Sequence, residues 1–344
     1  LIDNGSTDNC GITSLSLDKS TFTCADVGTN TVILTATDAS GNSATATAIV
    51  TVEDSTAPIV STQNVTVSLD ASGNASITTT LIDNGSTDNC GIASLAVTPN
   101  TFTCTDAGTN TVTLTATDGS GNSASQTAIV TVEDSTAPIV STQNVTVALD
   151  AAGNASITTA LIDNGSTDNC GIISLTLDQT TFTCADAGTN TVTLTATDAA
   201  GNSASQTAIV TVEDSTAPIV STQNVTVSLD AAGNASITTA LIDNGSTDNC
   251  GITSLTLDQT TFTCADAGTN TVILTATDAA GNSATATAIV TVEDNTAPIA
   301  STQNVTVSLD ASGAASMTAA LIDNGSTDNC GITSLTLDQT TFTC

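Results

Sequence analysis

The sequence predicts an all-β fold in which tandem β-sandwich domains follow one another end to end as a rod. Two observations lead to this prediction: a strict 80-residue repeat, and short alternating apolar and polar segments separated by turn-forming residues. The segment LIDNGSTDNC begins at Leu1 and recurs at Leu81, Leu161, Leu241 and Leu321 without insertion or deletion. A period of this length indicates an array of one structural unit.

Strands are predicted most clearly between residues 57 and 136. The expected strands cover residues 65–69, 75–81, 94–97, 102–104, 109–117 and 124–132. In the clearest of them, residues 109–117, Val112, Leu114 and Ala116 face one side and threonines face the other. Six or seven short strands in each repeat, with turn residues between them, predict a β-sandwich.

The segment TVEDSTAPIV at residues 51–60 marks the best domain boundary, because Pro58 interrupts a continuous β-ladder. Complete domains are expected at 57–136, 137–216 and 217–296, with partial domains at 1–56 and 297–344. A linker of only a few residues predicts that neighbouring domains touch end to end.

The charge balance excludes several classes of function. Lys19 is the single basic residue against 34 acidic ones, which gives a net charge of -33, and there is no His. Such a chain repels nucleic acid and anionic membranes, and no apolar run approaches the ~18 residues that span a bilayer. Without His, and without a base beside a nucleophile, we expect no enzyme; cations are the natural small partners.

Each repeat holds two cysteines that lie fourteen residues apart. A disulfide within each repeat is the favoured interpretation; a reduced buried pair and pairing between chains are the alternatives. Closing a loop of about 15 residues stabilises a small core by ~3 kcal/mol and requires an oxidising compartment. The expected pairs are Cys10–Cys24, Cys90–Cys104, Cys170–Cys184, Cys250–Cys264 and Cys330–Cys344.

Acidic residues are expected to converge where consecutive domains meet. The loop IDNGSTDNC and the hairpin TATDGSGN of one domain should face the Glu-Asp pair that ends the domain before it. Carboxylates crowded together repel one another unless a cation sits between them, and hard oxygen ligands suit Ca²⁺. The alternative is that these acids are turn and solubility residues. The candidate ligands are Glu53, Asp54, Asp83, Asp88, Asp118, Asp134, Asp163, Asp168, Asp198, Asp214, Asp243, Asp248, Asp278, Asp294, Asp323 and Asp328.

The combination of TDNCGI, TATDASGNSA and TVEDSTAP once per repeat resembles the hyalin-repeat (HYR) family of immunoglobulin-like domains. The close repetition is similar to arrays in giant cell-surface adhesins of Bacteroidetes, including gliding adhesins exported by type IX secretion. Asp118 and Asp54 also resemble acids of cadherin calcium motifs. In addition, the linker segment Asp-Ser-Thr resembles a Bacteroidetes O-glycosylation motif, which makes Ser55, Ser135 and Ser215 candidate glycosylation sites.

The resemblance implies an extracellular, cell-surface stalk or filament that presents an adhesive tip and acts as a spacer. Its partners would be neighbouring repeats, identical chains in a filament, and surface ligands that bind regions outside this segment. Two alternatives remain: repeats that themselves bind polysaccharide or a neighbouring filament, and a hyalin-type extracellular matrix layer. The lack of Trp and Tyr favours the spacer over a sugar-binding surface.

Overall fold

The computed structural model describes residues 2–344 and confirms the all-β prediction. The chain divides into two compact units. One unit comprises Leu1–Ser141, Gly165–Thr176 and Thr195–Gln206, and the other comprises Thr142–Asn164, Leu177–Leu194 and Thr207–Cys344. We number the repeats from first to fifth as residues 1–56, 57–136, 137–216, 217–296 and 297–344.

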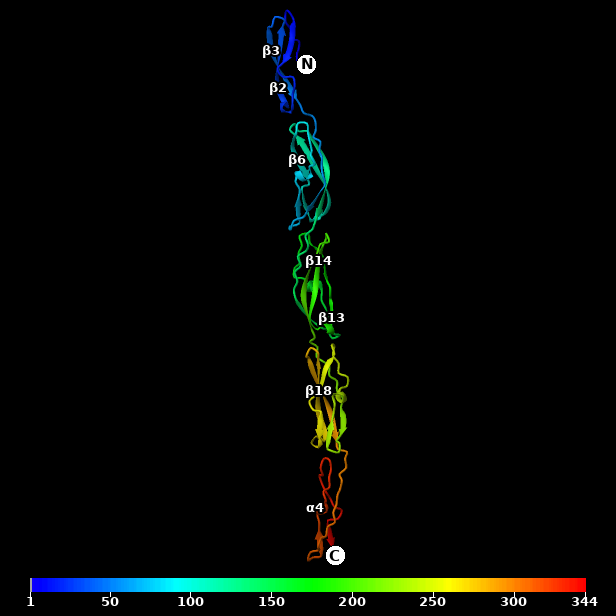
Figure 1. Cartoon of the computed structure of the whole chain (residues 1–344). Coiled ribbons are helices and arrows are strands. Elements are labelled where there is room, and N and C mark those ends of the chain that lie inside the picture. The colour runs from blue at the N-terminus through cyan, green and yellow to red at the C-terminus, as the bar shows by residue number, and fades with distance from the viewer. Residues whose placement is uncertain (1) are drawn as a thin grey trace. The chain divides into compact units, whose positions relative to one another are not determined.

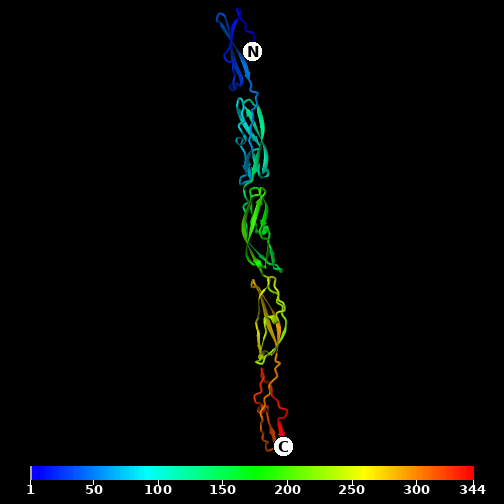
Figure 2. The same cartoon turned by 45° about the vertical axis from the view of Figure 1, so that its right-hand side comes forward.

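The second repeat contains a four-stranded sheet in the order β4-β9-β8-β6. Its strands run side by side in both views (cyan to green in Figures 1 and 2). β4 is parallel to β9, whereas the β9–β8 and β8–β6 pairs are antiparallel. The strands are β4 (Val65–Ser68), β6 (Ile92–Thr98), β8 (Gly108–Asp118) and β9 (Ser123–Glu133).

A second, smaller layer covers one face of this sheet. β5 (Asn74–Ser76) pairs antiparallel with β7 (Thr101–Thr103), and isolated bridges join Ile59 to Thr87 and Thr62 to Asp83. The side chains between the layers form one apolar core, which confirms the β-sandwich. The buried members of this core are Leu69, Ile77, Ile82, Val97, Phe102, Val112, Leu114, Ala128, Val130 and Val132.

The second predicted strand is shorter than expected. Residues 75–81 do not form one strand; β5 ends at Ser76, and Thr79–Ile82 forms the short helix α1. The helical turn buries Ile82 completely and leaves Leu81 43% exposed, although the strand prediction placed Leu81 inside. A single turn is too short to produce a helical period in the sequence, so alternation alone could not reveal it.

The other repeats carry the same elements where their sequence is complete. The third repeat has β10 (Val145–Ala148), β11 (Asn154–Ser156), α2 (Thr159–Ile162), β12 (Ile172–Leu177), β13 (Thr181–Thr183), η3 (Cys184–Asp186), β14 (Gly188–Asp198) and β15 (Ser203–Glu213). The fourth has β16 (Val225–Ser228), β17 (Asn234–Ser236), α3 (Thr239–Ile242), β18 (Ile252–Leu257), β19 (Thr261–Thr263), η4 (Cys264–Asp266), β20 (Gly268–Asp278) and β21 (Ser283–Glu293).

The first and fifth repeats hold fewer elements. The first has β1 (Ile12–Leu17), η1 (Cys24–Asp26), β2 (Gly28–Asp38) and β3 (Ser43–Val52), and the second repeat also contains η2 (Cys104–Asp106). The fifth has β22 (Ala314–Ser316), α4 (Ala319–Ile322) and β23 (Thr341–Thr343). None of the helices formed by the described residues is long and apolar enough to cross a membrane.

The strand directions define two ends in the second repeat. β8 runs from Gly108 to Asp118, and β9 returns antiparallel to Glu133. The hairpin after Asp118 therefore lies at one end, here called the N-terminal end. The turn at residues 70–73 lies at the other, C-terminal end, because the Leu69 amide donates to the Glu133 carbonyl. The same division applies to each complete repeat.

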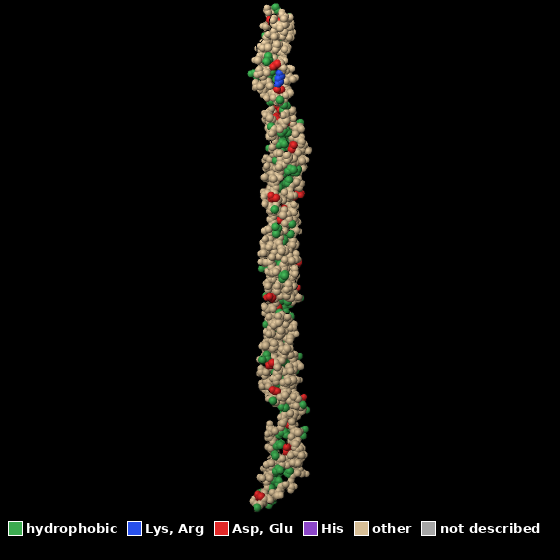
Figure 3. Space-filling view, turned by 60° about the vertical axis from the view of Figure 1, so that its left-hand side comes forward, with side chains coloured by type: hydrophobic (Ala, Val, Ile, Leu, Met, Phe, Trp, Pro, Cys, Tyr) green, Lys and Arg blue, Asp and Glu red, His purple; other side chains and the backbone are tan. Residues whose placement is uncertain are grey.

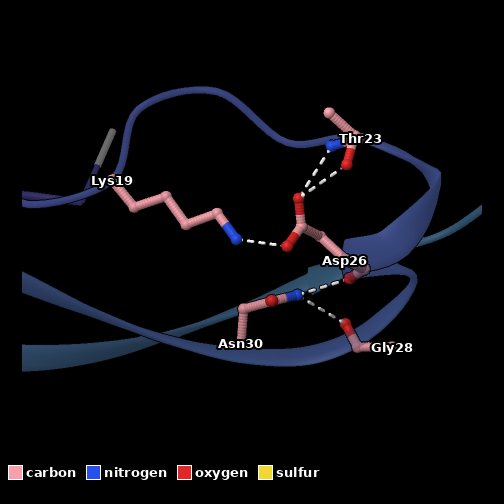
Figure 4. A network of polar contacts seen from close by, with 5 residues as sticks. All are labelled: Lys19, Thr23, Asp26, Gly28 and Asn30. Carbon is pink, nitrogen blue, oxygen red and sulfur yellow. Dashed lines mark hydrogen bonds and ion pairs between the residues drawn. The ribbon is translucent and has the colours of Figure 1, made fainter.

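The surface is almost free of positive charge. The face in Figure 3 is mostly tan, with scattered acidic side chains and a single blue side chain. Among residues 2–344 one ion pair occurs, between Lys19 and Asp26. Asp26 also accepts from the Thr23 amide at 2.8 Å, and Asn30 donates to the Asp26 carbonyl at 2.6 Å (Figure 4). Lys19 is therefore paired with Asp26 of η1, within the first repeat.

Candidate junction sites between repeats

The structure pairs cysteines of consecutive repeats, so the predicted disulfide within each repeat is wrong. Each bond joins residues 66 positions apart and links one repeat to the next; we call each such place a junction. The four bonds, at the first to fourth junctions, are Cys24–Cys90, Cys104–Cys170, Cys184–Cys250 and Cys264–Cys330. Cys10 and Cys344 are free and exposed.

The strand between the two cysteines of a repeat explains the error. Cys90 precedes β6 and Cys104 follows β7, so the two residues lie at opposite ends of the second repeat. The seven residues of β6 alone extend over about 23 Å, whereas disulfide-bonded Cα atoms lie no more than about 7 Å apart. Cys104 reaches Cys170 of the next repeat instead, with the Cα atoms 5.3 Å apart.

A glycine makes room for this bond at the C-terminal end of the repeat. Gly73 has a φ of +75°, and a Cβ atom placed on it would lie 2.6 Å from Sγ of Cys104 and 2.9 Å from the carbonyl oxygen of Asn169. Gly153 and Gly233 show the same crowding at the third and fourth junctions. The sequence predicted an ordinary turn here, so the role of this glycine was missed. The repeated D-x-x-G pattern was the available signal, but it does not reveal the approaching repeat.

Three carboxylates meet at each of the first three junctions. At the second junction, Asp134 follows β9, Asp168 lies in the loop before β12, and Asp198 ends β14. One carboxylate oxygen of each lies within 4.8 Å of the others. We call this set an acidic triad. The equivalent triads are Asp54, Asp88 and Asp118 at the first junction, and Asp214, Asp248 and Asp278 at the third.

Two asparagines hold the triad of the second junction in place. The side-chain amide of Asn202 donates to Asp198 Oδ2 at 2.8 Å and to the Asp134 carbonyl at 3.1 Å. The side-chain amide of Asn169 donates to Asp134 Oδ1 at 3.2 Å and to the Asp70 carbonyl of the preceding repeat at 3.2 Å. Neither asparagine was assigned a role from the sequence, yet both connect the two repeats.

Other oxygens at the junction are buried without a hydrogen-bond donor. Asp168 Oδ2 accepts from the Cys170 amide at 2.8 Å, but its Oδ1 has no partner. An unsatisfied buried oxygen costs free energy, and three neighbouring negative charges add repulsion. The buried oxygens without a partner are Asp54 Oδ2, Asp88 Oδ1, Asp134 Oδ2, Asp168 Oδ1, Asn169 Oδ1, Asp214 Oδ2, Asp248 Oδ1, Asn249 Oδ1, Asp328 Oδ1 and Asn329 Oδ1.

This donor set fits a hard divalent cation. Carboxylate and amide oxygens are the ligands that Ca²⁺ takes, in sets of six to eight that can include backbone carbonyls and water. The single described ion pair uses Lys19 in the first repeat, so no basic side chain among residues 2–344 neutralises a triad. A bound divalent cation would coordinate the unpartnered oxygens and balance two of the three negative charges of a triad.

The third acid of each triad is the most buried. Asp118, Asp198 and Asp278 are 3%, 0% and 3% exposed. Burial raises the pKa of the Asp118 carboxyl, but hydrogen bonds from the Asn122 side chain and from the amides of Asn122, Ser120 and Gly121 outweigh burial and hold the pKa below its ordinary value. The hairpin therefore favours the ionised form of this carboxylate.

Several predicted ligands lie outside the triads. Asp83, Asp163, Asp243 and Asp323 each end a short helix, α1 to α4. Asp83 accepts from the hydroxyl and amide of Ser86, and these bonds engage it within its own repeat. Glu53 is exposed and does not join the triad of its neighbour Asp54.

The fourth junction forms no triad among the described residues. Asp328 keeps a buried oxygen without a partner, but Asp294 is exposed and accepts from the Thr296 amide. No residue among 2–344 occupies the third position of a triad at this junction, where Asp278 stands at the third junction. The candidate glycosylation residues Ser55, Ser135 and Ser215 are exposed beside the first acid of each triad.

The comparisons with known proteins connect the chain to repeat proteins. No family model matches it. Hyalin of Strongylocentrotus purpuratus is 30% identical over 329 residues, which cover 89% of this chain and 27% of hyalin. The chain thus spans about a quarter of that relative's length.

Solved cadherin structures also align with the chain. The protocadherin gammaB4 extracellular domain is 15% identical, with 88% of this chain and 64% of that chain covered and a TM-score of 0.31. Mouse cadherin-23 EC22-24 is 14% identical, with 69% and 99% covered and a TM-score of 0.30.

Proposed function

We propose that this chain is an extended extracellular spacer whose repeats are joined end to end by disulfide-bonded junctions that bind Ca²⁺. The observation that carries the proposal is the recurrence of one arrangement: an acidic triad with buried, unpartnered oxygens beside a disulfide between repeats. Four disulfides favour an oxidising compartment outside the cytosol.

The cation would set the stiffness of the chain. Without it, three carboxylates and the orphaned oxygens favour opening of the junction toward water. With it, the acids from the linker, the loop and the hairpin share one ion, and the two repeats are held in one orientation. The proposed domains at 57–136, 137–216 and 217–296 would then each add about 36 Å, the length of the 11 residues of β8.

The wider role of such a spacer is to hold an adhesive tip away from a cell surface. Phe102, Phe182 and Phe262 are buried, so they offer no ring for stacking on a sugar, and this supports a spacer over repeats that bind polysaccharide themselves. We place the chain in a large secreted cell-surface adhesin of the gliding-adhesin type, exported by type IX secretion. The adhesion target would bind regions outside this segment, and glycans on Ser55, Ser135 and Ser215 would shield the linkers.

The second candidate is a structural strand of a hyalin-type extracellular layer. The 30% identity to hyalin over most of the chain supports it. In this role identical chains would associate laterally into a filament or sheet, whereas a stalk would stay a single chain. Sedimentation of the purified chain with Ca²⁺ separates the two: a monomer favours the stalk, and large assemblies favour the layer.

Calorimetric titration of the whole chain with CaCl₂ tests the cation proposal. Because three triads are complete, we expect about three equivalent sites, and Asp54→Asn should remove one of them. Glu53→Gln is the matched control: it removes the same charge one position away, from an exposed residue outside the triad. Absence of saturable binding, or equal losses from both variants, would contradict the proposal.

A further inference from the structure

The disulfides bypass most of the polypeptide. Each disulfide joins two cysteines that lie 66 residues apart in the sequence. In the second repeat, for example, Cys90 is bonded to the preceding repeat and Cys104 is bonded to the following one. A continuous covalent path therefore runs from Cys24 to Cys330 through four disulfides and the three short segments that separate them. The other residues between these two cysteines lie in four loops closed by the bonds.

We propose that this covalent shortcut is a tether that carries tension, limits extension and keeps the chain joined after its linkers are cut. The inference rests on the spacer function proposed above, because only a chain that connects two distant points is placed under tension. It does not depend on Ca²⁺.

The shortcut allows little extension. The segment from one bond to the next spans fourteen Cα–Cα steps and stretches to at most about 50 Å, and each disulfide adds a Cα–Cα distance of 5.2 to 5.3 Å. The shortest covalent path through the disulfides therefore stretches to about 55 Å per repeat. The folded strand β8 is about 36 Å long, and a repeat without disulfides would stretch to about 280 Å. Unfolding of a repeat would lengthen the chain by tens of ångströms instead of hundreds.

The segment that carries the tension is suited to it. Residues 90–104 contain β6, which lies at the edge of the sheet and pairs antiparallel with β8 from Ser94 opposite Thr117 to Thr98 opposite Thr113. Tension applied at Cys90 and Cys104 acts along the backbone of this strand, which is already extended, so covalent bonds carry it and β6 has little length left to give. The long β8–β9 hairpin lies inside a disulfide loop and outside the shortest path.

The linkers are dispensable for covalent continuity. The four glutamates of the chain, Glu53, Glu133, Glu213 and Glu293, are exposed, and each lies inside a different disulfide loop. Cleavage after every glutamate would produce five pieces that the four bonds still hold together. A surface fibre of this design would survive proteolysis at these exposed sites.

Digestion of the chain with a glutamate-specific protease tests this directly, with Cys10→Ser and Cys344→Ser in the background to block thiol exchange. We expect one full-length band without reductant and five fragments with it. Adding Cys104→Ser/Cys170→Ser to this background should release two parts without reductant, whereas the background chain itself should release none. Separation of the chain that carries only Cys10→Ser and Cys344→Ser into five fragments without reductant would overturn the inference.

Single-molecule stretching between the two termini measures the tether itself. We expect the oxidised chain to show no long steps, and Cys104→Ser/Cys170→Ser to add one length increment of about 220 Å, because 66 residues join the path. If the cysteines paired within repeats, this variant would release only about 90 Å, from two much shorter loops. Increments above about 200 Å per repeat in the oxidised chain, close to the length of a fully extended repeat, would overturn the inference while leaving a calcium-stiffened spacer intact.

Discussion

The interior of a repeat and the junction between repeats are stabilised in opposite ways. In the second repeat, Phe102, Val112 and Leu114 are 2%, 0% and 0% exposed and pack in one apolar core. At the second junction, buried carboxylate and amide oxygens of Asp134, Asp168 and Asn169 have no donor. The interior is complete by itself, whereas the junction buries charge and unpartnered oxygens that the proposed cation would coordinate. The free energy of folding thus comes mainly from the apolar core of each repeat, whereas the polar junction determines how consecutive repeats are connected.

The strongest way to test this contrast is to damage the interior and leave the junction intact. Phe102→Ala should lower the free energy of unfolding by about 3–5 kcal/mol, because it leaves a cavity between the two layers. Denaturant titration measures the loss, and Phe102→Leu should cost less because it keeps most of the volume. Calcium stoichiometry in native buffer should not change; a lost site would show that interior and junction are not separable.

A smaller effect is expected from crowding the junction. Gly153→Ala would place a Cβ atom 2.6 Å from Sγ of Cys184 and 2.9 Å from the carbonyl oxygen of Asn249 in the next repeat, and should destabilise the third junction by about 1–3 kcal/mol. Gly165→Ala is the matched control, because Gly165 also has a positive φ, +82°, but nothing lies within 4 Å of the added Cβ. Both substitutions strain the backbone, but only the alanine at Gly153 meets neighbouring atoms. The difference between the two unfolding temperatures therefore measures the effect of that crowding. Equal losses would contradict the close approach of the two repeats.

The interior was largely predictable from the sequence, whereas the junction was predictable only in part. Alternation along residues 109–117 identified β8 and its buried face, because period-two patterning reports which side of a strand meets the core. The convergence of Asp54, Asp88 and Asp118 also followed from strand order. The partner of Cys104 could not be predicted in this way, because it depends on which end of a neighbouring repeat approaches. Similarly, spacing along the chain does not show that Ser86 engages Asp83 within the repeat.

The smallest predicted effect concerns acid stability of the interior. The hydroxyl of Ser86 donates to Asp83 and holds the pKa of its carboxyl below the ordinary value. Since the folded-state pKa is lowered, this stabilisation is present above the unfolded pKa and is lost as the pH falls through the lower folded value. In chelator, the unfolding temperature should decrease once the pH drops below about 4, and this decrease should be slightly smaller in Ser86→Ala. An identical pH profile for both chains would show that the bond does not favour the ionised carboxylate.

The central claim is that cations at the junctions hold consecutive repeats in one orientation, and small-angle X-ray scattering of the whole chain tests it most directly. In Ca²⁺ we predict the profile of a stiff rod, with about 36 Å of length for each repeat. Excess chelator should decrease the radius of gyration and remove the cross-section region typical of a rod. Without the cation the carboxylates of each triad repel one another, while the disulfides still link the repeats. A profile that is the same in Ca²⁺ and in chelator would contradict the claim.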